Sequence, residues 1–255
     1  MTRQNVANLP ELTAWKADNL RMTAILSPAA QLPKHSLWEE LLGQPPENIT
    51  SQPRIGVQQE EGAFEGEKLI VTVQPTRIDW IFTVDNNQNT TISQKITSIG
   101  QFVDALNPFV DLMVRWLQIS PPLQRLAFGA TLLLPMDESS AARQQLLAYL
   151  PLNPQAFENA QEFAYQINRP RNSISGISDL PINRLSKWSV ISWRTIQIVP
   201  KVNNSSDESC FTCCLEVDIN TSPEYQGDLP SERLPQLFRE LVDLGQEIAR
   251  EGDIP

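Results

Sequence analysis

Three cysteines lie close together in the C-terminal quarter of the chain, within the segment Cys210-Phe211-Thr212-Cys213-Cys214. This spacing superficially resembles a metal or redox site. If the segment is a strand, however, Cys210 and Cys214 face one way and Cys213 the other, and residues four apart are separated by roughly 13 Å. One zinc ion cannot bridge that distance, and the chain has one histidine and no further cysteine to complete four ligands. We therefore interpret the cysteines as packing residues of a sheet and predict no cofactor.

A catalytic pair of serine or cysteine with histidine would have to use the single histidine, His35. This residue stands directly before a predicted short helix, where an exposed loop position is expected. The sequence also lacks a Gly-x-Ser-x-Gly nucleophile turn and a Gly-x-x-x-x-Gly-Lys phosphate loop. Nucleophilic hydrolysis and nucleotide hydrolysis are therefore both disfavoured.

Three carboxylates, Glu216, Asp218 and Glu224, form the densest acidic group near the end of a predicted strand. Paired carboxylates can hold a hard cation or exchange protons with a substrate. The outward positions of a half-exposed strand are more often simply solvated. We predict no catalytic residue, and we keep a metal-dependent enzyme built on these three residues as an alternative.

Charge is distributed unevenly along the chain, which has a net charge of −10. Residues 201–255 contain 12 acidic and four basic residues, and so carry −8 of this charge. An acidic protein is a poor match for nucleic acid, whose phosphates are neutralised by Lys and Arg. It is better suited to another protein with a basic surface. We expect one contact surface on the exposed side of the last predicted helix, at Asp243, Glu247 and Glu251.

Basic residues are concentrated just upstream, in a Ser-, Asn- and Pro-rich connection between two predicted strands, at Arg169, Arg171, Arg184 and Lys187. Connections longer than about 12–15 residues within a compact domain are usually functional or disordered. Two interpretations of the segment 170–187 stay open, a disordered insertion and a recognition loop. In the second, these four residues form another contact surface, and any nucleic-acid role would be restricted to this loop.

Apolar periodicity predicts the elements that position these residues. Alternating residues predict strands, most clearly over 209–220. Helical spacing predicts a long helix over 95–117, in which Pro108 should cause a kink or a restart. The last predicted helix, 231–251, begins at Ser231 as a plausible N-cap.

The order of these elements indicates an internal duplication. The first half reads as a strand near 20–26, a helix at 36–42, strands at about 54–60, 67–74 and 77–84, and the helix over 95–117. The second half reads as a strand near 124–134, a helix at 139–149, strands at about 161–169, 188–199 and 209–220, and the helix over 231–251. Both follow the order β-α-β-β-β-α. The sequence therefore predicts an α+β fold of two pseudo-repeated halves, 1–120 and 121–255, with mainly antiparallel sheet and helices on one face; the halves could also form one continuous domain.

The predicted hairpin Leu69-Ile70-Val71-Thr72-Val73-Gln74-Pro75-Thr76-Arg77-Ile78-Asp79-Trp80 resembles the hallmark hairpin of a sporadically distributed bacterial protein family of uncharacterised function. Later segments are similar to that family as well: Arg125-Leu126-Ala127-Phe128-Gly129, Phe163-Ala164-Tyr165-Gln166-Ile167-Asn168, the strand Leu215-Glu216-Val217-Asp218-Ile219-Asn220, and the helix over 231–251. The last helix of the family often bears a histidine, whereas this chain has Leu244-Gly245 in that region. The resemblance implies the order of elements and brings neither catalytic residues nor a function.

The start of the chain lacks the apolar segment of a signal peptide, and no stretch approaches the roughly 20 apolar residues needed to cross a bilayer. With no disulfide framework, the sequence predicts a cytoplasmic protein that does not bind a membrane. Our leading hypothesis is a non-enzymatic protein–protein interaction module, such as an antitoxin-like protein or an accessory subunit of a defence system. The alternatives are the metal-dependent enzyme and a self-assembling structural subunit, for instance a symmetric homodimer.

Overall fold

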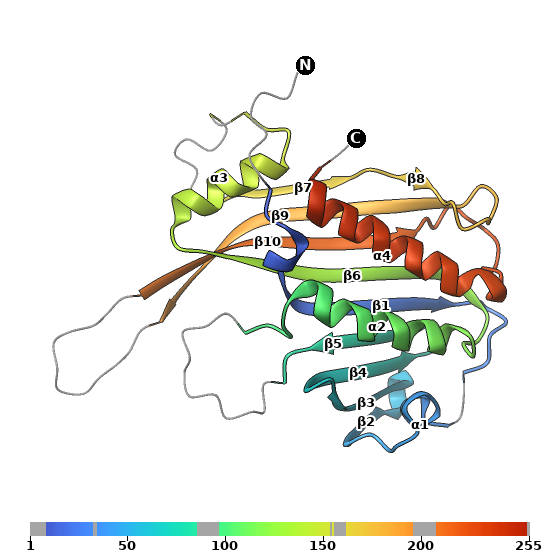
Figure 1. The fold of residues 1–255 in the computed structure, drawn as a ribbon. Helices are drawn as coiled ribbons and strands as arrows, with labels where there is room; N and C mark the ends of the chain where they lie inside the picture. Colours follow the sequence, from blue (N-terminus) through green and yellow to red (C-terminus); the bar gives the residue numbers. More distant parts are fainter. Residues whose placement is uncertain are drawn as a thin grey trace, which may run out of the picture.

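The computed structural model of the protein describes residues 9–32, 35–85, 97–153, 155, 162–195 and 208–253. These residues form an α+β fold, in which four helices accompany one ten-stranded antiparallel sheet (Figure 1). The strands are β1 (Lys16–Leu26), β2 (Asn48–Gln52), β3 (Val57–Phe64), β4 (Glu67–Gln74), β5 (Arg77–Thr83), β6 (Leu123–Met136), β7 (Ala164–Asn168), β8 (Arg171–Asn172), β9 (Pro181–Thr195) and β10 (Glu208–Thr221).

The sheet runs without interruption through both predicted halves of the chain. Its strands follow the order β2-β3-β4-β5-β1-β6-β10-β9-β7, and β8 also pairs with β9. The first strands of the two halves, β1 and β6, pair with each other in the middle of the sheet. On their outer sides β1 pairs with β5 and β6 pairs with β10. The segments 1–120 and 121–255 therefore contribute to a single sheet.

The four helices described lie on one face of this sheet: α1 (Leu37–Leu42), α2 (Phe102–Leu117), α3 (Ser139–Tyr149) and α4 (Leu234–Glu251). The two long helices, α2 and α4, cross the sheet side by side (Figure 1). Within the described residues, no helix combines the length and the apolar character needed to span a bilayer.

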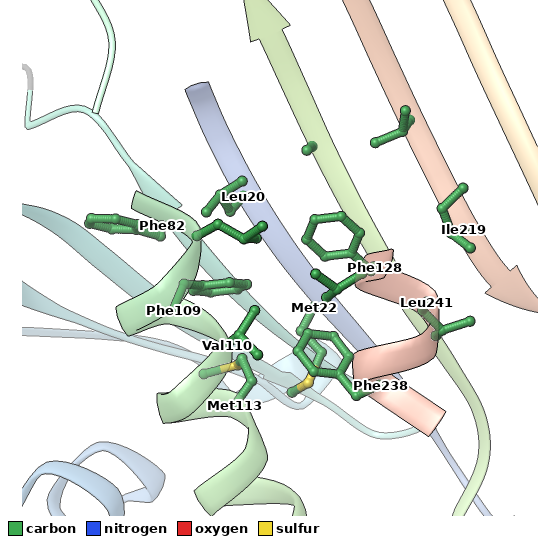
Figure 2. Close-up of a cluster of buried hydrophobic side chains, with 14 of the residues drawn as sticks. Leu20, Met22, Phe82, Phe109, Val110, Met113, Phe128, Ile219, Phe238 and Leu241 are labelled. Atoms are coloured by element: carbon green, nitrogen blue, oxygen red, sulfur yellow. The ribbon is translucent and has the colours of Figure 1, made fainter. Parts of the chain in front are cut away.

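The hydrophobic core fills the layer between the two long helices and the sheet. Figure 2 shows Phe109 of α2 and Phe238 of α4 pointing toward residues of the central strands, among them Phe128 of β6. The rings of Phe128 and Phe238 pack edge to face, with their centroids 6.1 Å apart. Helix α4 lies close to the sheet at Gly245, where a Cβ atom would be 2.9 Å from the Phe128 ring. No larger side chain fits at this position without a shift of the ring, so glycine is required for this helix–sheet approach.

The predicted short helices at 36–42 and 139–149 are confirmed. Ser36 caps α1 as predicted, because its hydroxyl accepts a hydrogen bond of 3.0 Å from the N–H of Glu39. Ser231 does not cap α4 directly. It begins a short 3-10 turn, Ser231–Arg233, and α4 follows from Leu234.

Helix α2 begins later than predicted, and it continues through Pro108. It begins at Phe102 rather than near residue 95, since Gly100 has φ +113° and the N–H of Ile99 donates to the carbonyl of Ala17 in β1. The predicted residues 95 and 96 lie outside the described part of the chain. Pro108 does not restart the helix, which runs through it from Phe102 to Leu117.

Half of the connection predicted over residues 170–187 is strand. Residues 171–172 form β8, and β9 already begins at Pro181, so the longest irregular part is residues 173–180. The sequence did not show the alternation of apolar and polar residues that is typical of a strand here, because two polar side chains, Arg184 and Ser186, occupy buried positions of β9. Strand β2 was also missed, since all five of its residues are exposed and it shows no apolar alternation.

Candidate functional site

Glu247 on α4 binds two arginines that come from the sheet. Arg171 donates to both carboxylate oxygens, with Nη2–Oε1 at 2.8 Å and Nη1–Oε2 at 3.0 Å. Arg184 donates to the same Oε1 at 3.1 Å, and its side chain is only 2% exposed. Burial and the neighbouring Arg171 lower the pKa of Arg184, while Glu247 acts in the opposite direction.

Asp253, just beyond the end of α4, holds the third arginine of this region. Its carboxylate accepts hydrogen bonds from Arg169 and, at 2.6 Å, from the hydroxyl of Tyr165. Burial by itself would raise the pKa of Asp253, but the hydrogen bonds from Arg169 and Tyr165 outweigh burial and lower it below its ordinary value. Burial, followed by the hydrogen bond to Asp253, raises the pKa of Tyr165 to about 12.

The two contact surfaces predicted from charge therefore meet in part: Arg171 and Arg184 bind Glu247, and Arg169 binds Asp253, which was not among the predicted contact residues. Sheet pairing brings the arginines together, since the N–H of Arg169 donates to the carbonyl of Arg184 and β8 pairs with the start of β9. They face the C-terminal end of α4, where Glu247 and Asp253 neutralise most of their charge. We call these residues, Arg169, Arg171, Arg184, Glu247 and Asp253, the ion-pair cluster. Its members stabilise the fold, and they are only partly available to a partner.

A groove of about 410 Å³ adjoins the ion-pair cluster, between α4 and the segment 171–175. One apolar side chain lines the groove on each side: Ile174 in the segment 171–175 and the half-buried Leu244 on α4. The Ile174 side chain is 85% exposed, which is unusual for an isoleucine. Exposed charges border the groove at Arg239 and Asp243. We call this feature the α4 groove.

The segment beside the α4 groove is held in place by Glu240, which the sequence analysis did not single out. The Glu240 carboxylate accepts hydrogen bonds of 2.7 Å from the hydroxyl of Ser173 and 2.7 Å from the N–H of Ile174. A further hydrogen bond of 2.8 Å, from the N–H of Ser173 to the carbonyl of Leu180, closes the base of the loop. The interpretation of this connection as a disordered insertion is therefore wrong for the loop at 173–180.

Of the other predicted contact residues, Asp243 and Glu251 are exposed on α4, and no described residue forms an ion pair with either. Lys187 lies elsewhere. It is on the opposite face of the sheet, where its ammonium is 2.7 Å from the carboxylate of Glu216. Hydrogen bonding to Glu216 raises the pKa of Lys187.

This opposite face has a shallow depression of about 270 Å³ over the middle of the sheet. Arg21, Gly129 and Asp218 lie in one row across β1, β6 and β10, and the guanidinium of Arg21 is 3.1 Å from the carboxylate of Asp218. Gly129 leaves room for the Arg21 side chain, since a Cβ atom there would be 3.1 Å from it. The depression therefore presents charges that are already paired.

The three carboxylates of the metal alternative do not assemble into a ligand set. Glu216 binds Lys187, Asp218 binds Arg21, and Glu224 lies in the turn after β10, where its N–H donates to Ser222. Among the described residues, no group of three or more His, Cys, Asp or Glu side chains is placed to hold a metal ion.

The hairpin that carries the family resemblance has a packing role in the structure. Arg77 donates to both oxygens of Asp79, at 2.6 and 2.7 Å, and Thr23 of β1 donates to Asp79 at 2.6 Å. On the other side of the strand, the Trp80 ring packs against Trp116 of α2 at 6.1 Å between centroids. These contacts tie β5 to β1 and to α2, far along the sheet from the α4 groove.

The remaining candidates for chemistry also have structural surroundings. His35 is exposed and lies 2.9 Å from the carboxylate of Glu40. Cys213 and Cys214 are free and are buried in β10. Burial raises the pKa of Cys213 to about 12 and that of Cys214 to about 11, so both stay protonated at neutral pH.

Comparison with known proteins gives no relative from which a function could be transferred: no family model, no curated protein and no solved structure matches this chain.

Proposed function

We propose that this protein is a non-enzymatic protein–protein interaction module that binds its partner in the α4 groove. The observation that carries the proposal is the pair of apolar side chains, Ile174 and Leu244, between charged rims. Interfaces of this kind combine an apolar centre with a polar border. The groove is also held by a fixed frame, because Glu240 anchors the segment on one side of it. A partner would thus meet a preformed surface, which reduces the entropy cost of binding.

The partner that fits this surface is a protein segment with an apolar residue flanked by basic residues. The apolar residue would contact Ile174 and Leu244. Basic residues would be attracted by Asp243 and by Glu251, which lies two helical turns further along α4 and is also exposed. The acidic C-terminal quarter of the chain extends this attraction beyond the groove and would accelerate association.

The wider assignments rest on sequence. We propose that the protein acts in the cytoplasm, as an antitoxin-like protein or an accessory subunit of a defence system, and that it belongs to the uncharacterised bacterial family whose hairpin it resembles. We also propose that segments 1–120 and 121–255 are copies of one plan. Each begins with a strand in the middle of the sheet and ends with a long helix, which supports this view.

The test begins with affinity capture from the native host, and the captured protein is then titrated with purified variants. Reversing Asp243 and Glu251 to lysine should weaken binding by at least tenfold, since two attractive charges become repulsive. Glu247 must be left intact, because its reversal would deprive Arg184 of its counter-ion. A loss of binding could then not be distinguished from a loss of stability. Reversal of two exposed acids on α2, Asp104→Lys with Asp111→Lys, changes the net charge equally and is the matched control.

A second pair of variants tests the apolar part of the groove. Ile174→Ser should weaken binding by about tenfold, whereas Ile119→Ser, at another exposed isoleucine, should leave it unchanged. Equal losses from the α4 and α2 charge reversals would show that net charge alone attracts the partner. Full binding by both the α4 reversal and Ile174→Ser would exclude the groove as the contact surface.

A further inference from the structure

Strand β2 forms one edge of the ten-stranded sheet, because among the described residues it pairs with β3 and with no other strand. All five of its residues are exposed, and the Ile49 side chain is 60% exposed. Every second residue of an edge strand directs its N–H and C=O away from the one neighbouring strand. Such a row of unpaired groups is a template for another strand.

This edge lacks the usual features that prevent edge-to-edge pairing. Between Asn48 and Gln52 there is neither a charged residue nor a proline. The opposite edge strand, β7, also has neither a charged residue nor a proline within it, and a proline and an arginine follow each of the two strands. The residues of β7 alternate between exposed and half-buried, whereas all five residues of β2 are exposed. Of the two edges, β2 is therefore the more accessible to another chain.

We propose that β2 pairs antiparallel with β2 of a second copy of this chain, with the two-fold axis at Thr50. In this register Thr50 lies opposite Thr50, Ile49 opposite Ser51, and Asn48 opposite Gln52. No like charges face each other, and threonine pairs and amide pairs are favourable across strands. The sequence of β2 is thus compatible with its own antiparallel copy.

Charges that flank the strand strengthen this register. Glu47 precedes β2 and Arg54 follows it, so antiparallel pairing brings Glu47 of each copy toward Arg54 of the other. The N–H of Ala63 in β3 donates to Oε1 of Glu47 at 3.1 Å, so this oxygen faces β3 and the other oxygen, Oε2, is the one left for Arg54 of the second copy. Arg54 is exposed, and no described residue forms an ion pair with it. Two opposite-charge contacts would therefore form, one at each end of the paired strands.

The geometry of the pairing limits the assembly to two copies. A β2–β2 contact uses the same surface on both partners and closes as a dimer, whereas a β2–β7 contact would continue into an open filament. A five-residue strand covers less than the roughly 1,200 Å² typical of stable interfaces, and each copy carries a charge of −10. The dimer should accordingly be weak and should strengthen when salt screens the repulsion.

Cysteine cross-linking tests the register directly. At the two-fold axis, two Thr50→Cys residues would have Cα atoms about 4.5–5.5 Å apart, within disulfide range. Gln52→Cys is the matched control on the same exposed strand, because its two copies would be roughly 13 Å apart. Under mild oxidation we expect a covalent dimer from Thr50→Cys at least tenfold in excess of that from Gln52→Cys, with the unmodified chain as baseline for its own cysteines.

Sedimentation equilibrium provides the second measurement, on chains without added cysteines. Ile49→Lys should weaken the dimer by about tenfold, since it places positive charges close to the axis, whereas Ile119→Lys should have no effect. The proposal is overturned if the unmodified chain stays monomeric up to about 1 mM in about 0.15 M salt. It is equally overturned if Gln52→Cys cross-links as well as Thr50→Cys, or if larger species grow with concentration.

Discussion

The guanidinium of Arg184 lies 3.1 Å from the carboxylate of Glu247, at a position of the sheet where the arginine side chain is 2% exposed. Its Nε atom is buried, and no described residue accepts a hydrogen bond from it. A buried cation held in this way depends strongly on its counter-ion. Arg184 and Glu247, which the charge distribution predicted to be contact residues, thus bind each other and hold the end of α4 on the sheet.

Glu247 is the counter-ion that the buried Arg184 requires. Glu247→Ala should lower the free energy of unfolding by about 3 kcal/mol, because it leaves Arg184 buried without a partner. Asp243→Ala, one helical turn away and exposed, should change it by less than about 0.5 kcal/mol. Urea denaturation measures both. Adding Arg184→Met to Glu247→Ala should recover part of the loss, and similar effects of the two single variants would contradict this account.

Gly252 offers a test of how tightly the end of α4 is packed. It has φ +82°, and a Cβ atom there would be 2.1 Å from the carbonyl oxygen of Tyr149. Gly252→Ala should therefore destabilise the protein by more than about 2 kcal/mol, through backbone strain and a clash with main-chain atoms. Gly43 has φ +70°, and no atom of the described residues lies within 4 Å of a Cβ placed there. Gly43→Ala therefore introduces the backbone strain without the clash and should lower the free energy of unfolding by about 1 kcal/mol. Thermal denaturation compares the two variants. An equal decrease of the melting temperature in both would contradict the expected clash and show that the Tyr149 main chain can move to accept the added methyl group.

Acid should weaken the fold through Asp253. The pKa of Asp253 is lower in the folded protein than its ordinary value of 3.8, so the unfolded chain binds the proton more tightly. The stabilisation is complete above that ordinary value and is lost as the pH falls through the folded-state pKa. Urea denaturation between pH 6 and pH 2 should show this decline, and Asp253→Asn should be less stable at pH 6 and flatter across the same range. An identical pH profile for the variant would exclude Asp253 as the cause.

The hairpin motif should prove structural when it is altered. Asp79 is 5% exposed and accepts hydrogen bonds from Arg77 and Thr23. Asp79→Ala should therefore cost about 2–3 kcal/mol of unfolding free energy, whereas Asp104→Ala on the exposed side of α2 should cost less than about 0.5 kcal/mol. Partner binding measured below the unfolding transition should stay unchanged in both variants. Loss of binding in folded Asp79→Ala would instead place the hairpin in the contact surface.

Sequence patterns predicted the elements that have one apolar and one polar face. The strand at 209–220 and the helix at 231–251 belong to this class, and β10 and α4 occupy nearly the same residues. Strand β2 has no such contrast because both of its faces are exposed. The first half of β9 was missed for the opposite reason, since Arg184 takes a buried position at which a strand pattern would show an apolar residue.

The candidate site was less predictable, because it depends on contacts between distant segments. Charge counting identified Arg171 and Glu247, but nothing local indicates that they bind each other across 76 residues. One signal was present in the sequence. Glu240 lies on the apolar stripe of the last helix, beside Leu237 and Leu241, and an acidic residue on a buried stripe indicates a specific polar partner.

The pairing of β1 with β6 has a consequence for the integrity of the chain. If the polypeptide were cut between residues 120 and 121, each fragment would be left with a new edge strand of more than ten residues, Lys16–Leu26 or Leu123–Met136, that is paired on one side only. Neither fragment could pair that edge alone. Co-expressed pieces would therefore be expected to reassemble with each other, and pieces made separately to precipitate.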